Sequence, residues 1–329
     1  MPFKLNADRR HRIPRQIHKV TNWPAYEAGL RQRGSLTLWF TDEAIEAWRA
    51  EPRASRGRQP WYSPLAILTA LTLRAVFRLA FRQTEGLIGS IVALLGLSLR
   101  VPDHTTLSRR SATLDVPRPS RPRIGADGRA EPMHLLVDST GLKLCGPGEW
   151  LVEKHGTRTR RSWRKLHLAI DADTGQIVAA SLTAKEGDDG ADEVGVLLDQ
   201  AGGPVATFTA DGGYDQDNVY ADVAERHPDA KVVVPPRMTA VPSAMAVTAP
   251  TQRDCHLRCI AEHGRMGWQK RSGYNARALA EVAIGRWKQV IGGALRAHKD
   301  ERRATEVEVA VYALNRMLEF ARPNYVRTA

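Results

Sequence analysis

The chain has 329 residues, of which 43% are hydrophobic and 26% are charged, so it can bury one large or two ordinary cores and is not a disordered or fibrous chain. Its three cysteines cannot all be paired in disulfides, and nothing at the N-terminus resembles a secretory leader. We therefore expect a globular protein of the reducing cytoplasm.

The formal net charge of +12 comes entirely from the first part of the chain. Residues 1–130 contain 22 Lys and Arg against 10 Asp and Glu, whereas the remaining residues contain 26 of each. Duplex DNA carries one negative charge per about 1.7 Å of its axis and is the partner that such a basic region suits. The alternative is that arginine is abundant because of genome composition, which explains its amount but not its uneven distribution.

Residues 1–60 are predicted to form a basic arm followed by a short helix. The arm contains the run Arg9-Arg10-His11-Arg12, and the helix is expected over Asp42–Arg49. Basic arms of this kind commonly become ordered only when they bind DNA.

Residues 61–116 have the pattern of a small all-helical domain. Apolar helices are predicted over Pro64–Phe81 and Thr84–Leu95, and a third helix is predicted to begin after Asp103, a good N-cap residue. The apolar stretch in the first helix is interrupted by two arginines and is too short for a membrane span. We therefore expect a core helix and no association with a membrane.

The last two of these helices, joined by a tight turn, are a candidate helix-turn-helix motif. The recognition helix would be the one that begins at Asp103. It would present hydroxyl and guanidinium groups to DNA from Thr105, Thr106, Arg109 and Arg110. The alternative is a solvated polar helix, because a helix-turn-helix signal in a single sequence is weak.

Beyond residue 116 the character of the sequence changes. Residues 117–131 interleave prolines with arginines and are predicted to be a stiff basic linker. Residues 132–323 contain short apolar runs separated by turn residues, and residues 324–329 are predicted to be a tail. The predicted strands are Leu135–Leu144, Lys165–Ile170, Gln176–Ala184, Val205–Thr209 and Lys231–Val234, with helices over Asp192–Ala201 and Gln216–Arg226.

The order of these elements is that of a ribonuclease H-like fold, with strands first, then alternating helices and strands, and finally a C-terminal helix. We therefore predict an α/β catalytic domain, with a mixed sheet flanked by helices, that follows an all-helical DNA-binding region. No element is predicted for residues 238–269.

Three acidic residues are placed to bind metal. Asp138 and Asp211 each follow an apolar run that is typical of a buried strand, and Glu281 lies on the predicted C-terminal helix. Carboxylates from three rigid elements can supply the oxygen ligands of two Mg²⁺ ions about 4 Å apart, with Mn²⁺ as a substitute. Such a pair of ions supports in-line displacement at phosphorus. Taken singly, each aspartate could instead cap a turn or end a strand.

Four polar residues would share one stripe of the C-terminal helix. They are Tyr274, Arg277, Glu281 and Lys288, which span an arc of only ~60° at about 100° per residue. The opposite side would carry Leu279, Ala283, Trp287 and Val290. The pattern predicts a buried carboxylate flanked by cations, with Lys288 and Arg277 on DNA phosphates and Tyr274 hydrogen-bonded to or stacked on the DNA. The alternative is a surface stripe of salt bridges.

A second basic cluster lies close in sequence to the strand that carries Asp138. It comprises Arg158, Arg160, Arg161, Arg164 and Lys165, with Trp163 among them. We predict that this cluster clamps DNA near the carboxylates, and the alternative is a solvated loop.

Three segments of the sequence are similar to one known family. The spacing Tyr-two-Arg-three-Glu-six-Lys of residues 274–288 resembles, without departure, the signature around the catalytic glutamate of insertion-sequence transposases of the DDE class. The segments Leu135–Gly141 and Thr209–Asp215 resemble the two aspartate blocks of that class, particularly those of insertion sequence family five. The resemblance spans most of the chain and includes Pro102–Arg110.

The resemblance implies a ribonuclease H-like catalytic domain that cuts and joins transposon DNA ends with Mg²⁺. Asp138, Asp211 and Glu281 would be the catalytic triad and the metal ligands. The expected partners are double-stranded DNA, both as terminal inverted repeats and as target, and further copies of this chain, because two DNA ends must be paired. Such a protein would act in the cytoplasm, on the nucleoid. The alternative is a DNA-binding protein of transposase ancestry that no longer cleaves.

Overall fold

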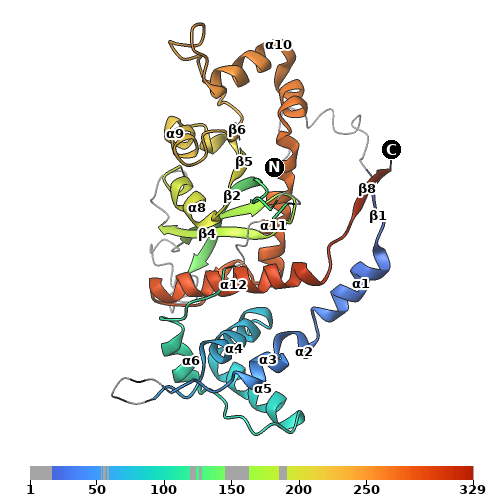
Figure 1. The fold of residues 1–329 in the computed structure, drawn as a ribbon, viewed down its shortest axis with the longest axis vertical. Coiled ribbons are helices and arrows are strands. Elements are labelled where there is room, and N and C mark those ends of the chain that lie inside the picture. The colour runs from blue at the N-terminus through green and yellow to red at the C-terminus, as the bar shows by residue number, and fades with distance from the viewer. Residues whose placement is uncertain are drawn as a thin grey trace, which may run out of the picture. The chain divides into compact units, whose positions relative to one another are not determined.

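The computed structural model describes residues 17–52, 54, 57, 59–118, 124–125, 128–144, 163–184 and 191–328. The chain divides into two compact units. The larger unit is Trp39–Asn315, and the smaller unit joins Met1–Leu38 with Arg316–Ala329. The elements of both units are labelled in Figure 1.

In the smaller unit, segments from the two ends of the chain are joined by backbone hydrogen bonds. Strand β1 (Ile17–Val20) pairs antiparallel with β8 (Tyr325–Thr328). Helix α1 (Trp23–Gln32) approaches the C-terminal segment at Gly29, where a Cβ atom would lie 2.2 Å from the Cβ of Ala321. Because only glycine fits this close approach, the contact depends on the absence of a side chain at position 29.

The first half of the larger unit is helical. The division between the units falls within α2 (Leu36–Trp39). The helices that follow it are α3 (Asp42–Glu46), α4 (Pro64–Val76), α5 (Phe81–Leu94) and α6 (His104–Arg110). Helix α4 begins at its predicted position, where the Ser63 hydroxyl accepts a hydrogen bond from the Ala66 N–H. Across the described ranges, no single helix is long and apolar enough to cross a membrane, and α4 and α5 meet that test only as a pair bent by 112°.

The predicted first helix of this region is too long. Helix α4 stops at Val76, and Arg78 then adopts a left-handed conformation with φ 53°, which ends the helix. The guanidinium of Arg78 donates hydrogen bonds to the backbone carbonyls of Gln289 and Val290. Helix α5 therefore begins earlier than predicted, at Phe81. The break depends on a contact with a distant part of the chain, which no local pattern indicates.

A mixed sheet forms the second half of the larger unit. Its strands are β2 (Met133–Leu144), β3 (Trp163–Asp171), β4 (Ile177–Ala184), β5 (Val205–Thr209) and β6 (Lys231–Val233). Their order is β4-β3-β2-β5-β6, with β3 antiparallel to both neighbours and with β2, β5 and β6 parallel to one another. The short strand β7 (Ala294–Leu295) pairs in parallel with the far end of β2. The five predicted strands are all present, and β5 has its predicted boundaries.

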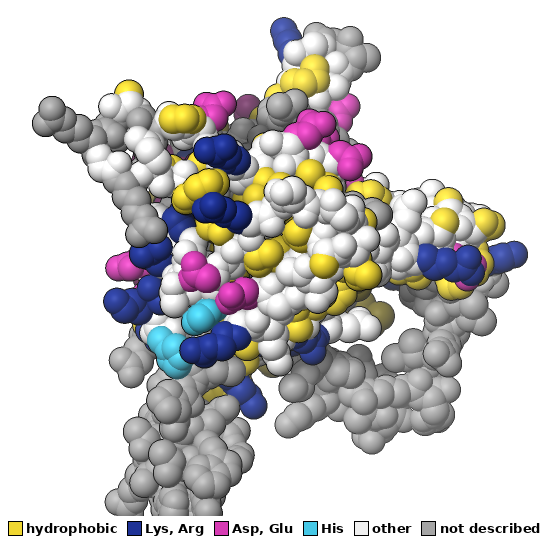
Figure 2. All heavy atoms as spheres, turned by 90° about the horizontal axis from the view of Figure 1, so that it is seen from below, with side chains coloured by type: hydrophobic (Ala, Val, Ile, Leu, Met, Phe, Trp, Pro, Cys, Tyr) yellow, Lys and Arg dark blue, Asp and Glu magenta, His cyan; other side chains and the backbone are white. Residues whose placement is uncertain are grey.

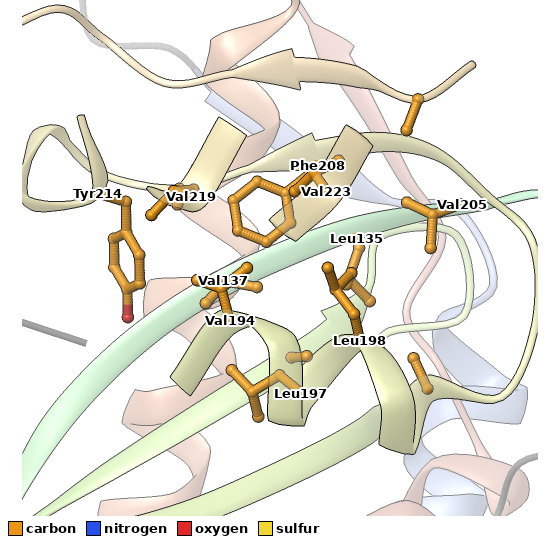
Figure 3. Packing of buried hydrophobic residues seen from close by; sticks show 14 of the residues in the cluster. Leu135, Val137, Val194, Leu197, Leu198, Val205, Phe208, Tyr214, Val219 and Val223 are labelled. Carbon is orange, nitrogen blue, oxygen red and sulfur yellow. The ribbon is translucent and has the colours of Figure 1, made fainter. Parts of the chain in front are cut away.

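Helices cover both faces of this sheet, as the predicted mixed α/β architecture requires. Helices α8 (Glu193–Ala201) and α9 (Asp217–Arg226) lie on one face. The core beneath them contains Leu135, Val137, Val194, Leu197, Phe208, Val219 and Val223 (Figure 3). Successive residues of a strand point to opposite faces, so Asp138 points away from this core. It faces α11 (Ala278–Val290), which packs beside β2, and α12 (Asp300–Phe320) follows.

A long helix occupies much of the segment for which no element is predicted. Helix α10 (Gln252–Ser272) begins at a capping box formed by Thr251 and Asp254 and is interrupted at Gly264, where φ is 69°. Its buried residues are Asp254, His256 and Trp268. Because these residues do not form an apolar stripe, the helix has no clear amphipathic signal in the sequence.

Candidate active site

Adjacent parallel strands place Asp138 and Asp211 side by side. In the register of β2 and β5, Leu136 lies opposite Thr209, and each aspartate is two residues further along the chain. Both carboxylates therefore lie where β5 ends beside β2. Asp138 is buried, with 7% of its surface exposed, whereas the side chain of Asp211 is 43% exposed.

The buried position of Asp138 changes its acidity. Burial raises the pKa of the Asp138 carboxyl above its ordinary value. The guanidinium of Arg277 and the backbone N–H of Ser139, which donates to Oδ1 at 2.8 Å, lower the pKa but do not outweigh burial. An ionised Asp138 therefore depends on cations beside it.

Asp211 is oriented by the backbone of the loop that follows β5. It is the N-cap of the 3₁₀ turn Gly212–Tyr214, and its Oδ1 accepts a hydrogen bond from the Gly213 N–H at 2.8 Å. A Cβ atom at Gly213 would lie 2.9 Å from the same oxygen, which is closer than real Cβ contacts. The turn-capping role considered for Asp211 is therefore present, and it fixes the direction of the carboxylate.

The three predicted catalytic carboxylates converge on one guanidinium group. Nη2 of Arg277 lies 3.1 Å from Oδ2 of Asp138 and 3.9 Å from Oδ2 of Asp211. Nη1 of Arg277 lies 2.7 Å from Oε1 of Glu281. The carboxylates come from a strand, a loop and a helix, and one cation contacts all of them. The structure thus brings the predicted triad together.

The predicted polar stripe differs from the observed helix. Residues Tyr274–Arg277 form a 3₁₀ turn, and α11 begins only after it, so the stripe does not lie on a single α-helix. The buried residues of α11 are Ala280, Ala283 and Trp287. Leu279, expected in the core, is 47% exposed, and the side chain of Glu281 is 55% exposed. The prediction of a buried carboxylate at Glu281 is therefore wrong, because the turn shifts the face that α11 buries.

The other two residues of the stripe have different surroundings. Tyr274 packs against Trp268, with 5.2 Å between the ring centroids, and Trp268 Nε1 donates a hydrogen bond to Nδ1 of His256 at 2.9 Å. Lys288 is exposed and lies about 10 Å along α11 from Glu281, at 1.5 Å per residue. Tyr274 is therefore fixed beside the carboxylates, whereas Lys288 stands further along the helix.

The donor atoms of this site suit a hard divalent cation. All three side chains offer carboxylate oxygens, which Mg²⁺ and Mn²⁺ prefer. In the part of the chain that the structure describes, no group of three or more His, Cys, Asp or Glu side chains is spaced to hold a metal ion. The guanidinium of Arg277 lies among the carboxylates and contacts one oxygen of each.

An ion pair that the sequence analysis missed supports the loop that carries Asp211. Arg253 of α10 donates two hydrogen bonds to Asp215, from Nε to Oδ1 at 2.7 Å and from Nη2 to Oδ2 at 3.1 Å. Asp215 also accepts a hydrogen bond from the backbone N–H of Arg237 at 2.8 Å. The only sequence signal for this pair is that Asp215 ends the second aspartate block.

The predicted recognition helix is present as α6, with Asp103 as its N-cap. The hydroxyls of Thr105 and Thr106 both donate to the Asp103 carboxylate, and Arg110 donates to the backbone carbonyl of Tyr62 at 3.1 Å. Arg109 is exposed on the same helix. Three of the four side chains predicted to bind DNA thus have contacts within the protein, which leaves Arg109 as the exposed cation of α6.

The second basic cluster is described only in part. Arg158, Arg160 and Arg161 lie outside the described residues. Arg164, on β3, pairs with Oδ1 of Asp300 at 3.2 Å, and Lys165 follows it on the same strand and is partly exposed. Asp138 on β2 lies opposite Leu168 of β3. Arg164 and Lys165 precede Leu168 on β3, so both lie further along the sheet from Asp138.

The fold and the site together define a class of protein. A mixed sheet flanked by helices, with carboxylates at two neighbouring strands and on an adjacent helix, is consistent with a ribonuclease H-like domain. A family model described as Transposase DDE domain matches residues 129–318, which is more than half of the chain, and a second model with the same description matches residues 31–147. The chain belongs to the transposase DDE domain family. It therefore has the general function of a transposase, with DNA as its partner and divalent metal ions as its cofactors.

Proposed function

We propose that this chain is an active transposase of insertion sequence family five, with the Tyr-Arg-Glu-Lys signature at residues 274–288. It binds the terminal inverted repeats of its transposon and catalyses Mg²⁺-dependent phosphodiester hydrolysis and strand transfer, with Mn²⁺ as a substitute. The observation that supports this function best is the convergence of Asp138, Asp211 and Glu281 on Arg277. Three carboxylates that converge on one point could supply the oxygen ligands of the divalent ions used in metal-dependent phosphoryl transfer.

The three carboxylates have separate tasks in this mechanism. Asp138 and Asp211 are held rigidly by a buried strand and by a capped turn, so they define the position of the site. Glu281 is on an exposed helical turn and can close the site from the other side. When bound, divalent ions lower the pKa of the attacking water or 3′-hydroxyl and stabilise charge on the leaving oxygen.

Arg277 changes partners in this mechanism. In the structure its guanidinium balances the three carboxylates. Once their charge is balanced by metal, the guanidinium is available to bind a DNA phosphate, which matches its planar pair of donors. Lys288, about 10 Å further along α11, contacts a phosphate further along the strand, and Tyr274 borders the same path.

DNA recognition is assigned to the basic first part of the chain and to the cluster near β3. We expect the exposed Arg109 to contact DNA, supported by Thr105, Thr106 and Arg110 on the same helix. Arg158, Arg160, Arg161, Arg164 and Lys165 would bind DNA near the carboxylates. We also expect two or more copies of the chain to pair the DNA ends, on the nucleoid in the cytoplasm.

A strand-cleavage assay tests this function directly. The substrate is an oligonucleotide duplex that carries the DNA flanking this gene, with Mg²⁺ or Mn²⁺. The wild type should nick it, whereas Asp138→Asn, Asp211→Asn and Glu281→Gln should bind it without nicking. Glu262→Gln, which removes an exposed carboxylate of α10, is the matched control and should nick normally. If the wild type binds this DNA specifically and never nicks it, the protein is a DNA-binding protein that has lost catalysis.

A further inference from the structure

Two adjoining hollows open between the helical half of the larger unit and the segment that leads into α12. The first has a volume of about 470 Å³ and the second of about 520 Å³. Ala80, Phe81, Ser108 and Arg302 line both, so the two form one continuous depression. Figure 2 shows Lys and Arg side chains beside apolar surface on the face seen from below. None of the predicted metal ligands lines either hollow.

The first hollow has a surplus of positive charge. Arg74, Arg296 and Arg302 line it, and the only carboxylate among its lining residues is that of Glu306. Both oxygens of Glu306 accept hydrogen bonds from the backbone, from the N–H of Arg296 at 3.0 and 3.1 Å and from that of Ala297 at 2.8 Å. Within the described ranges, none of the three arginines has a carboxylate oxygen within 4.0 Å of its guanidinium nitrogens.

The arginines are held in place by groups that carry no charge. The guanidinium of Arg74 lies over the ring of Phe81, 4.3 Å from its centroid. Arg302 donates to the Ser108 hydroxyl at 3.1 Å, and Arg296 donates to the carbonyl of Leu79 at 3.0 Å. Burial lowers the pKa of Arg74, and the charge of Arg296 lowers it further, whereas the Glu306 carboxylate raises it without outweighing burial.

The second hollow extends the cationic surface toward α6. It adds Arg82, His104 and the exposed Arg109 to the shared residues. An apolar wall is present as well, because Leu71, Ala75 and Val309 line the first hollow. Guanidinium groups beside an aromatic ring and aliphatic side chains can bind a phosphate together with an adjoining base or sugar.

We propose that this depression binds a phosphate of a DNA strand, with Arg296 and Arg302 as donors, Arg74 at its base and Phe81 against the neighbouring base or sugar. This inference rests on the proposed function, which identifies DNA as the ligand. Binding of DNA in the depression requires neither metal nor cleavage. It adds an anchoring site for DNA that is separate from the carboxylates and that continues onto α6 at Arg109.

Salt-dependent binding of a fluorescein-labelled 30-base-pair duplex to the full chain, measured in EDTA, tests the proposal. Arg296→Gln and Arg302→Gln should each lower the slope of log K against log salt by about 0.9, and weaken binding roughly eightfold at 0.1 M salt, because one phosphate contact is lost. Arg302→Lys should keep the slope, since it keeps the charge. Lys231→Gln, which removes an exposed cation of β6, is the control and should match the wild type.

The remaining outcomes overturn the proposal. If both glutamine variants bind like the control, the arginines do not contact DNA. If Arg302→Lys loses as much affinity as Arg302→Gln and both unfold at a lower temperature, the arginine has a structural role only. If deoxyadenosine monophosphate raises the unfolding temperature of the wild type alone while the duplex slopes stay equal, the depression holds a free nucleotide. Because EDTA prevents cleavage, a failure here is distinct from a failure of the nicking assay.

Discussion

The carboxylate site and the arginine-lined depression have opposite charge imbalances within one unit. At the first, Asp138, Asp211 and Glu281 share the single guanidinium of Arg277. In the first hollow of the second, three guanidiniums are accompanied by one carboxylate, which already accepts hydrogen bonds from the backbone. Each site therefore has charge left over for a ligand of the opposite sign. If both proposals hold, the depression anchors DNA away from the carboxylates at which the strand is cut, so binding and cleavage can be altered separately.

The largest effect on cleavage is expected from a substitution beside Asp211 in which no acidic residue is replaced. In Gly213→Ala the new Cβ would displace Asp211 Oδ1, because the two atoms would lie only 2.9 Å apart. A misplacement of about 1 Å should reduce cleavage by about 100-fold. Gly212→Ala is the control, since its Cβ would lie 3.4 Å from its nearest neighbour. Equal single-turnover cleavage by both variants would show that the capped turn does not position Asp211.

The next effect concerns the cation inside the carboxylate site. Arg277→Gln removes a charged hydrogen-bond donor from the buried Asp138, so we expect the free energy of unfolding without metal to fall by about 2 kcal/mol. The same change removes the competitor for metal, so Mn²⁺ should raise the unfolding temperature of the variant more than that of the wild type. Thermal unfolding with and without Mn²⁺ measures both quantities. An equal or smaller shift in the variant would exclude competition between Arg277 and metal.

Acid should lower the stability of the sheet that carries the carboxylate site. His167 on β3 is fully buried, and burial lowers its pKa from 6.5 to about 4. The unfolded chain therefore binds a proton between about pH 6.5 and 4 that the folded chain does not, so this contribution to stability is present above pH 6.5 and is lost as the pH falls toward 4. Urea unfolding at pH 7 and 4.5 should show a loss of about 2 kcal/mol from this group, absent in His167→Gln. The same pH dependence in both proteins would assign the loss to other groups.

The smallest effect is expected at the base of the depression. Arg74→Met removes the guanidinium that lies over Phe81, together with its buried charge, and leaves an unbranched apolar side chain in its place. We expect the free energy of unfolding in phosphate-free buffer to stay constant or to rise by up to about 1 kcal/mol. Added inorganic phosphate should then stabilise the wild type more than the variant. A marked loss of stability in Arg74→Met would mean that the charge itself supports the fold.

Local patterns were sufficient for the sheet and for two of the three carboxylates. The strand that carries Asp138 and the strand before Asp211 are short apolar runs, which predicts both strands but not that they are neighbours in the sheet. Glu281 lies beside the same guanidinium as the two aspartates, but it is exposed and not buried as predicted, because the 3₁₀ turn at Tyr274–Arg277 changes which face of α11 is buried. A turn of this kind depends on how α10 ends at Gly273, which helical periodicity does not reveal.

The features that the sequence did not predict all depend on contacts between distant segments. Helix α4 ends where Arg78 reaches the carbonyls at the end of α11. The depression combines residues near Arg74 with residues near Arg302, so no single segment of the sequence indicates its positive charge. The pairing of Asp215 with Arg253 also joins separate elements. Such contacts are set by packing in three dimensions, whereas periodicity reports only on neighbours along the chain.

The pairing of β1 with β8 has a consequence for how the protein is made. The Thr21 hydroxyl donates to the Asn324 carbonyl, 303 residues further along the chain. A ribosome adding about 5–20 residues per second needs roughly 15 to 60 s to travel between them. In the described part of the chain β1 pairs with no other strand, and a lone strand edge can associate with foreign strands. Translation products that terminate before Tyr325 would therefore expose β1 permanently and be prone to aggregation.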